Sequence, residues 1–203
     1  RSFAKASSRI IVQQQYPHAL MYDLRLACID GKFVAATWRV PTRVYGDGEN
    51  TIRQLIEQEN KSPNRGVAYY APLATIDVSQ AASFLGDTIE TVPARGKEVQ
   101  VIGVANYGAG GEIIDATADI PQWMAEEAVR ISTASGLVVC GVDYIVSVQP
   151  TAASTVLDLD AYVIEVNKCP SLAIHDNPTS GKPRGAVAAY VEYLATIPPA
   201  TSL

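Results

Sequence analysis

Alternating apolar and polar positions mark several stretches of the chain as β-strands. Side chains two residues apart point to the same face of a strand, so strict alternation gives one apolar and one polar face. The pattern predicts strands over 10–14, 22–29, 33–40, 98–104, 137–148 and 162–167. Asp30-Gly31, between the second and third of these, is typical of a hairpin turn. Those two strands are therefore expected to pair antiparallel.

In four other stretches the apolar residues recur at intervals of three and four, which indicates helices. The predicted helices cover 51–58, 76–84, 121–135 and 185–197. The third begins at Pro121, and proline is favoured in the first turn of a helix. A polar, turn-rich stretch at 57–97 is expected to form a loop-rich inserted subregion. The sequence therefore predicts an α+β fold with a mainly antiparallel sheet flanked by helices.

The composition suits one globular domain, or two small ones. The 203 residues are 48% hydrophobic and 18% charged, which is enough to bury a core. A net charge of −5 without a basic stripe argues against a nucleic-acid partner, and no apolar run nears the roughly 20 residues that span a membrane. Three scattered cysteines indicate a reducing compartment, the cytoplasm, and the two histidines argue against a His-based zinc site.

The polar faces of the predicted strands carry side chains with recognisable chemistry. Five of them oppose the apolar face of their strand: Arg25, Arg39, Asp143, Glu165 and Asn167. If the strands share a sheet, these side chains line one floor. Carboxylate and amide oxygens suit Mg²⁺, and arginine forks suit phosphate oxygens, so the pattern suggests a metal–nucleotide site. The alternative is cross-strand ion pairing on a solvated sheet face. Under either interpretation, strand alternation places Val163 on the same face as Glu165.

The stretch N-Y-G-A-G-G at 106–111 predicts a glycine-rich loop. Its backbone N–H groups could approach an anion; the alternative is an ordinary loop whose glycines permit positive φ. The loop is neither a P-loop nor a dinucleotide fingerprint. Its function therefore stays open on composition alone.

Several segments together resemble ATP-grasp carboxylate–amine ligases. C-G-V-D-Y-I at 140–145 is followed by I-E-V-N-K-C-P at 164–170. The other matching segments are R-V-P (39–41), G-D-G-E-N-T-I-R-Q-L-I (46–56), N-K-S-P-N-R-G (60–66), N-Y-G-A-G-G (106–111) and H-D-N-P-T-S-G-K-P-R (175–184). Their order and spacing are similar to those of cyanophycin synthetases and of the glutathione-synthetase module of bifunctional glutathione enzymes. The ending G-K-P-R is closer to the former.

The resemblance implies a reaction and its cofactors. Such enzymes use ATP to phosphorylate a carboxylate, and an amine then attacks the acyl phosphate to form an amide. By resemblance, Asp143, Glu165 and Asn167 match ligands of Mg²⁺, with Mn²⁺ as an alternative ion. Arg25 and Arg39 match positions near the phosphates of ATP.

The same resemblance assigns two further segments. Val12, Gln13 and Gln14 match the strand whose backbone meets the adenine. Asn106, Gly110 and Gly111 match the loop near the acyl phosphate. The implied partner is a small amino acid or peptide substrate, and the oligomeric state is left open, a homo-oligomer included.

Departures from the family pattern keep other readings open. Family members often have acids at positions 13 and 14, an arginine at the position of Ile102 and a serine at that of Gly108. The lobe that bears the phosphate-covering lysine is missing, so 1–203 is expected to be the C-terminal portion of an ATP-grasp domain, inactive alone. The alternatives to a cyanophycin synthetase-like ligase are a glutathione synthetase-type ligase and a non-catalytic nucleotide-binding relative.

Overall fold

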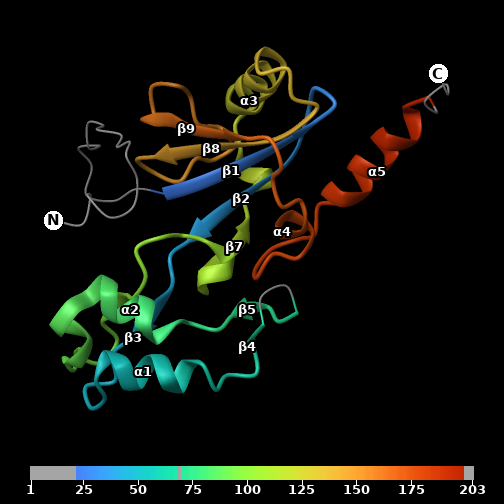
Figure 1. Ribbon diagram of the computed structural model, residues 1–203. Coiled ribbons are helices and arrows are strands. Elements are labelled where there is room, and N and C mark those ends of the chain that lie inside the picture. The colour runs from blue at the N-terminus through green and yellow to red at the C-terminus, as the bar shows by residue number, and fades with distance from the viewer. Residues whose placement is uncertain (1–21, 68–69, 199–203) are drawn as a thin grey trace, which may run out of the picture.

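A five-stranded antiparallel sheet forms the larger half of the protein (Figure 1). The computed structural model describes residues 22–67 and 70–198. The strands are β1 (Tyr22–Ile29), β2 (Lys32–Val40), β7 (Glu112–Asp115), β8 (Val139–Val146) and β9 (Ala161–Asn167), in the order β7-β2-β1-β8-β9. All four neighbouring pairs are antiparallel. The predicted α+β fold with a mainly antiparallel sheet is confirmed.

The hairpin between β1 and β2 forms as the sequence predicts. Asp30 and Gly31 have φ values of 51° and 67°, which a two-residue hairpin turn of the primed type requires. A β-bulge then interrupts the alternation, since Cys28 pairs with Phe33 whereas Ala27 pairs with Ala35. Residue 34 is therefore the extra residue of β2, and Phe33 packs against the core in its place.

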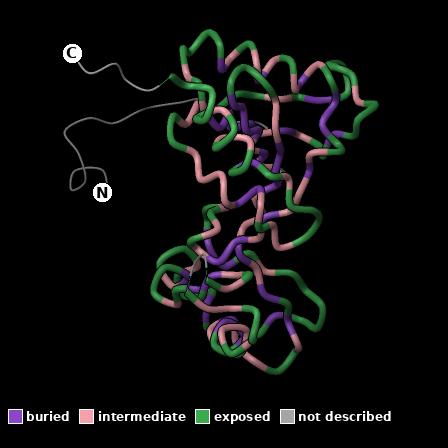
Figure 2. Tube along the Cα trace, turned by 90° about the vertical axis from the view of Figure 1, so that its right-hand side faces the viewer, coloured by how far each residue is buried: buried purple, intermediate pink, exposed green. Residues whose placement is uncertain are grey.

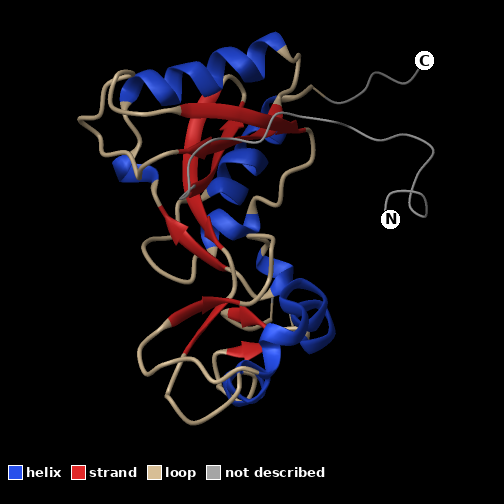
Figure 3. Ribbon diagram, turned by 90° about the vertical axis from the view of Figure 1, so that its left-hand side faces the viewer, coloured by secondary structure: helices blue, strands red, loops and turns tan. Residues whose placement is uncertain are grey.

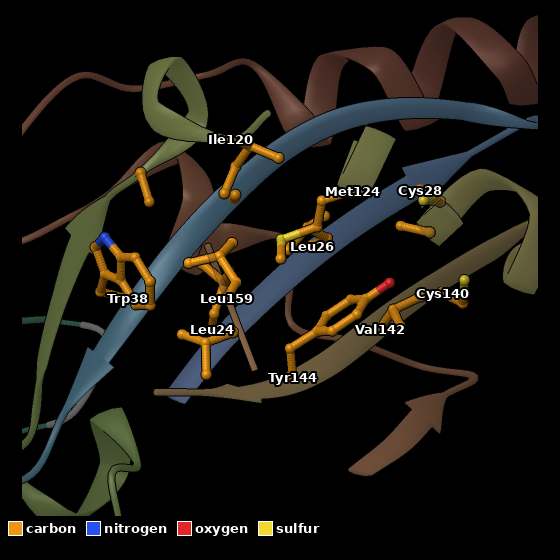
Figure 4. Packing of buried hydrophobic residues seen from close by; sticks show 14 residues of the cluster. Leu24, Leu26, Cys28, Trp38, Ile120, Met124, Cys140, Val142, Tyr144 and Leu159 are labelled. Carbon is orange, nitrogen blue, oxygen red and sulfur yellow. The ribbon is translucent and has the colours of Figure 1, made fainter. Parts of the chain in front are cut away.

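Helix α3 (Gln122–Ala134) covers one face of the sheet and closes the first hydrophobic core. Met124 and Ala128 are fully buried against the apolar faces of β1, β2 and β8. Figure 4 shows these side chains meeting in one layer: Leu24, Leu26, Trp38, Met124, Val142 and Tyr144 among them. Each fully buried side chain of this size contributes roughly 1.5–3 kcal/mol, so this layer is the main source of stability of the sheet.

A second, smaller core lies between β2 and β7 in the sequence. Its elements are α1 (Ile52–Glu59), α2 (Val78–Leu85) and the pairs β3–β6 (Arg43–Tyr45, Glu98–Gln100) and β4–β5 (Arg65–Gly66, Leu73–Ala74). Thr51 caps α1 through a capping box with Gln54. Ile52, Ile56 and Ile76 are among its buried residues, and Figures 2 and 3 show this part below the large sheet. The loop-rich subregion 57–97 falls inside it, and its status as an insertion stays a prediction.

The C-terminal segment lies on the face of the sheet opposite α3. Helices α4 (Ala173–Asp176) and α5 (Ala186–Thr196) contact β1 and β2 there. Three 3-10 helices, Gly86–Glu90, Tyr107–Ala109 and Thr117–Asp119, complete the described elements. The strands predicted at 98–104 and 137–148 are shorter than expected, and the one at 10–14 lies outside the described residues. Within 22–67 and 70–198, no helix is both long enough and apolar enough to cross a bilayer.

Candidate functional site

Asp143 is the centre of a charged cluster on the sheet face opposite α3. It is only 3% exposed, and Arg25 lies directly across from it on β1. Arg25 donates from Nε to Oδ1 and from Nη2 to Oδ2, both at 2.6 Å, and Arg39 donates from Nη2 to Oδ2 at 2.9 Å. Two guanidinium groups therefore neutralise one buried carboxylate, which makes its burial tolerable.

Gly141 leaves the room in which the Arg25 side chain lies. A Cβ atom at position 141 would be 3.2 Å from both Cδ and Nε of Arg25, and 3.1 Å from Cβ of Pro170. These distances are tighter than ordinary contacts, so a side chain here would push Arg25 away from Asp143. The glycine of C-G-V-D-Y therefore supports the ion pair two residues further on.

Asp23 is a member of the cluster that the sequence reasoning missed. It lies across from Arg39 in the β1–β2 register and accepts a hydrogen bond from Arg39 Nε at 2.7 Å. Burial raises the pKa of Asp23, and the charge of Arg39 opposes that rise without cancelling it. The strand alternation already placed Asp23 on the polar face, two residues before Arg25, so the signal was present in the sequence.

Glu165 and Asn167 reach the cluster from the edge strand β9. Asp143 pairs with Glu165, and Gly141 pairs with Asn167, in the β8–β9 register. The Asn167 amide donates from Nδ2 to Asp143 Oδ2 at 3.1 Å and to Glu165 Oε1 at 2.9 Å. The structure thus brings the three predicted metal ligands together on one face, as expected from their alternation.

A β-bulge at Ile164 corrects one expectation about this strand. Glu165 pairs with Asp143, but the next pair is Val163 with Tyr144, whose ring is buried in the first core. Paired residues share a face of the sheet, so Val163, itself 42% exposed on the edge strand, lies on the face of Tyr144 and not beside Glu165. The expectation that the two share a face is wrong because the pattern cannot reveal the extra residue.

The donor set of this cluster fits a hard cation. One NH₂ group, with its partial positive charge, lies between two carboxylates and contacts both, which is where a bridging cation would be stabilised. Rotation of the Asn167 amide would replace that NH₂ group by an oxygen, giving the all-oxygen set that Mg²⁺ prefers. Among the described residues no three His, Cys, Asp or Glu side chains form a metal-binding group, so the candidate set is two carboxylates and one amide.

The glycine-rich loop lies at the other side of the sheet. Residues 106–111 lead into β7, and strands β2 and β1 separate β7 from β8. Gly110 adopts a left-handed conformation with φ of 88°, and a Cβ at Gly111 would be 2.8 Å from the Val40 carbonyl oxygen. Asn106 and Gly108 are exposed, whereas Gly110 and Gly111 are buried. The role of Asn106, Gly110 and Gly111 near an acyl phosphate stays a prediction.

The predicted adenine strand cannot be placed. Val12, Gln13 and Gln14 lie outside the described residues. Their role in binding a nucleotide therefore stays a prediction, as do the roles of Arg25 and Arg39 toward phosphates.

Two further features of this face were missed by the sequence reasoning. Asp115 on β7 accepts hydrogen bonds from Arg184 Nε at 2.8 and 2.9 Å and from its Nη2 at 2.5 Å. Burial alone would raise the pKa of Asp115, but the bonds from Arg184 and Thr117 outweigh it and hold the pKa well below its ordinary value. This pair ties the segment that follows α4 to the large sheet.

His175 on α4 is completely buried near the charged cluster. Burial lowers its pKa to about 4, and the positive charge of Arg25 acts in the same direction. Among the described residues, neither ring nitrogen of His175 has a hydrogen-bond partner, and the same holds for the buried hydroxyl of Thr37. Helix α4, which carries His175, contacts β2, which carries Thr37.

Comparisons with known proteins find relatives that match most of this chain. The chain is 33% identical over 197 residues to a cyanophycin synthetase from Trichormus variabilis, covering 94% of this chain and 21% of that protein. It is 35% identical over 157 residues to the glutathione biosynthesis bifunctional protein GshAB of Streptococcus mutans, covering 75% of this chain and 21% of that protein. The chain thus spans about a fifth of the length of these relatives. No family model matches it.

A solved structure shares the fold. The bifunctional glutathione synthetase from Pasteurella multocida superimposes with a TM-score of 0.63 at 28% identity, over 87% of this chain and 24% of that one. Fold and sequence therefore lead to the same relatives. In particular, the chain is homologous to one segment of cyanophycin synthetases and of bifunctional glutathione biosynthesis proteins.

Proposed function

We propose that the protein is an ATP-dependent carboxylate–amine ligase that forms an amide or peptide bond through an acyl phosphate, in the manner of cyanophycin synthetases. The observation that carries the proposal is the floor of the sheet. It combines two arginines with two carboxylates and an amide: Arg25, Arg39, Asp143, Glu165 and Asn167. A solvated face with scattered ion pairs would not be expected to bury an acid to 3% exposure beneath two guanidinium groups.

The residues of the floor would divide two tasks. Asp143, Glu165 and Asn167 would hold Mg²⁺, with Mn²⁺ as an alternative, and the ion would supply charge neutralisation for ATP phosphates. Arg25 and Arg39 already lie on the floor with their guanidinium groups fixed by Asp143 and Asp23. Such fixed forks suit phosphate oxygens because little side-chain freedom is lost on binding.

The substrates proposed are an amino acid or peptide carboxylate and an amine. The loop 106–111 would lie near the reacting carboxylate, with exposed Asn106 and Gly108 on the substrate side. Cytoplasmic placement, a homo-oligomeric state and the absence of nucleic-acid and membrane partners stay predictions. A role as the C-terminal portion of a two-lobed ATP-grasp domain is part of the same proposal.

The test is magnesium-dependent ATP turnover with candidate amino acids and peptides, measured in the full-length protein because 1–203 alone is expected to be inactive. Glu165→Gln removes an anionic ligand while keeping the shape, so we expect at least a tenfold rise in the magnesium concentration needed for half-maximal turnover, of the size seen when metal-site groups are altered. Asn167→Asp keeps metal binding but adds a negative charge, and it should slow turnover at saturating magnesium. Val163→Thr, on the other face of the same strand, is the matched control and should change neither quantity.

Two results would contradict the proposal. If Glu165→Gln turns over like wild type at limiting magnesium, the floor is a solvated sheet face with structural ion pairs. If ATP binds with magnesium but no carboxylate stimulates turnover, the protein is a non-catalytic nucleotide-binding relative. One difference from the family pattern favours the second outcome. Family members often carry an arginine at the position of Ile102, whereas Ile102 is only 1% exposed in the second core and supplies no positive charge.

A further inference from the structure

We propose that Arg65 is a positioning residue for the glycine-rich loop, and that the loop-rich subregion acts on the candidate active site through it. The inference rests on the proposed function only for the part that the loop plays in the reaction. Arg65 belongs to the segment N-K-S-P-N-R-G, which contributes no residue to the charged floor.

The Arg65 side chain connects three separate elements. It lies on β4 and is only 4% exposed. Its Nε donates to Glu59 Oε1 at 2.8 Å, at the end of α1, and its Nη1 donates to the carbonyl oxygens of Ala74 at 2.9 Å and Gly110 at 3.1 Å. Gly110 is 45 residues away in sequence, so the bond is a specific link between the subregion and the loop.

Anchored carbonyl groups determine how the loop closes. The C=O and N–H of a trans peptide point in opposite directions, so a carbonyl held on one side directs its N–H to the other. Arg65 holds the Gly110 carbonyl, and the N–H of Gly111 then donates to the Asn106 carbonyl at 3.2 Å. Arg65 therefore fixes Asn106 through one peptide plane.

A second anchor works in the same way on the preceding peptide. Thr42 donates from Oγ1 to the Ala109 carbonyl at 2.8 Å, and the N–H of Gly110 donates to the Tyr107 carbonyl at 3.0 Å. The hydroxyl of Tyr107 in turn donates to the Ala71 carbonyl, within the subregion. The loop is thus held by Thr42, in the link between β2 and β3, and by Arg65 from the subregion.

The surroundings of Gly110 leave little room for a side chain. A Cβ there would lie 3.2 Å from the Ala74 carbonyl oxygen and 3.3 Å from Arg65 Nη1, and φ is 88°. Gly108, by contrast, has no atom within 4 Å of an added Cβ. The buried end of the loop is therefore fixed, while the end that bears Asn106 and Gly108 remains available to a substrate.

The experiment compares Arg65→Met with Arg53→Met, a control that removes an arginine of α1 whose ion pair with Glu90 is exposed. Amide hydrogen exchange, read by mass spectrometry, is measured over 106–111 and over the strands at 22–40. For Arg65→Met we expect exchange in 106–111 to become at least tenfold faster with the strands unchanged, and Arg53→Met should leave both unchanged. Arg65→Lys should fall between wild type and Arg65→Met, because one ammonium nitrogen cannot take the separate positions of Nε and Nη1.

Kinetics supply the readout that a purely structural role would not move. In the proposed reaction, Arg65→Met should lower kcat at least tenfold and leave the KM for ATP within twofold, since the loop serves the carboxylate rather than the nucleotide. Unchanged exchange in 106–111, or equal acceleration in the loop and the strands, would overturn the inference. If Arg65→Met does not fold, Glu59→Gln is measured instead. Glu59→Gln weakens the bond to Arg65 Nε but keeps the bonds from Nη1 to the carbonyl oxygens of Ala74 and Gly110. Amide exchange in 106–111 should then become about threefold faster, and an unchanged exchange rate would overturn the inference. If the full-length wild type shows no carboxylate-dependent turnover, the proposed function fails, while hydrogen exchange still decides the role of Arg65.

Discussion

Replacement of His175 by leucine should make the protein less sensitive to acid. The imidazole is completely buried and, within the described part of the chain, neither nitrogen has a partner. Burial, assisted by the charge of Arg25, lowers its pKa to about 4 from an ordinary 6.5. The unfolded chain therefore binds the proton more tightly than the folded one. Stability is independent of this group above pH 6.5 and falls as the pH drops from 6.5 toward 4.

The size of the effect follows from the two pKa values. Each pKa unit corresponds to about 1.4 kcal/mol, so at pH 4.5 the histidine should cost wild type about 2 to 3 kcal/mol of its free energy of unfolding. His175→Leu removes this cost. At pH 7.5 the variant should unfold within about 1.5 kcal/mol of wild type, because the side-chain volumes are similar and no hydrogen bond is lost.

The assay is guanidinium chloride unfolding of both proteins at pH 7.5, 6.5, 5.5 and 4.5. The difference between the two free energies isolates the histidine, because carboxylates such as Asp115 titrate in both proteins. We expect the variant to gain about 2 to 3 kcal/mol relative to wild type between pH 7.5 and pH 4.5. Parallel loss of stability in the two proteins would refute the reasoning and would mean that the folded protein accommodates the imidazolium.

Three other substitutions test the sheet face and the loop. Gly141→Ala should displace Arg25 and lower the free energy of unfolding by about 1–3 kcal/mol in urea titration, and an unchanged midpoint would contradict the tight contacts. Asp115→Asn should cost about 1.5–3 kcal/mol and accelerate hydrogen exchange around Arg184, whereas exchange like that of wild type would show that the pair is dispensable. Gly108→Ser should leave thermal unfolding within about 0.5 kcal/mol, since the added Cβ meets nothing, and should raise carboxylate-dependent turnover if the hydroxyl serves the substrate. A fall in stability would contradict the open space around Gly108.

Strand alternation predicted the charged floor because a period of two reports faces directly. Arg25, Asp143, Glu165 and Asn167 were placed on one side by this argument, and the strand register brings them together. The argument failed at Val163, since a bulge adds one residue without changing the composition of the strand. Bulges are decided by local twist and pairing, which a single sequence does not display.

The contacts of Asp115 could not be predicted for a different reason. Its strand β7 has only four residues and follows the glycine-rich loop, so no alternation precedes it. Its partner Arg184 is 69 residues away and lies in a turn-rich segment. Pairing of this kind depends on how the chain returns to the sheet, and only the three-dimensional structure shows that path.

The position of the second core within the chain has a consequence for the order of folding. Its buried residues all lie between Val44 and Ile102, whereas β1 must wait for β8, 118 residues from Arg25 to Asp143. Closing the longer loop costs more chain entropy, by about 0.6 kcal/mol for each doubling of length. We expect the local core to form first and to shorten the effective distance between β2 and β7, so that the large sheet is completed last, when β8 pairs with β1 and β9 with β8.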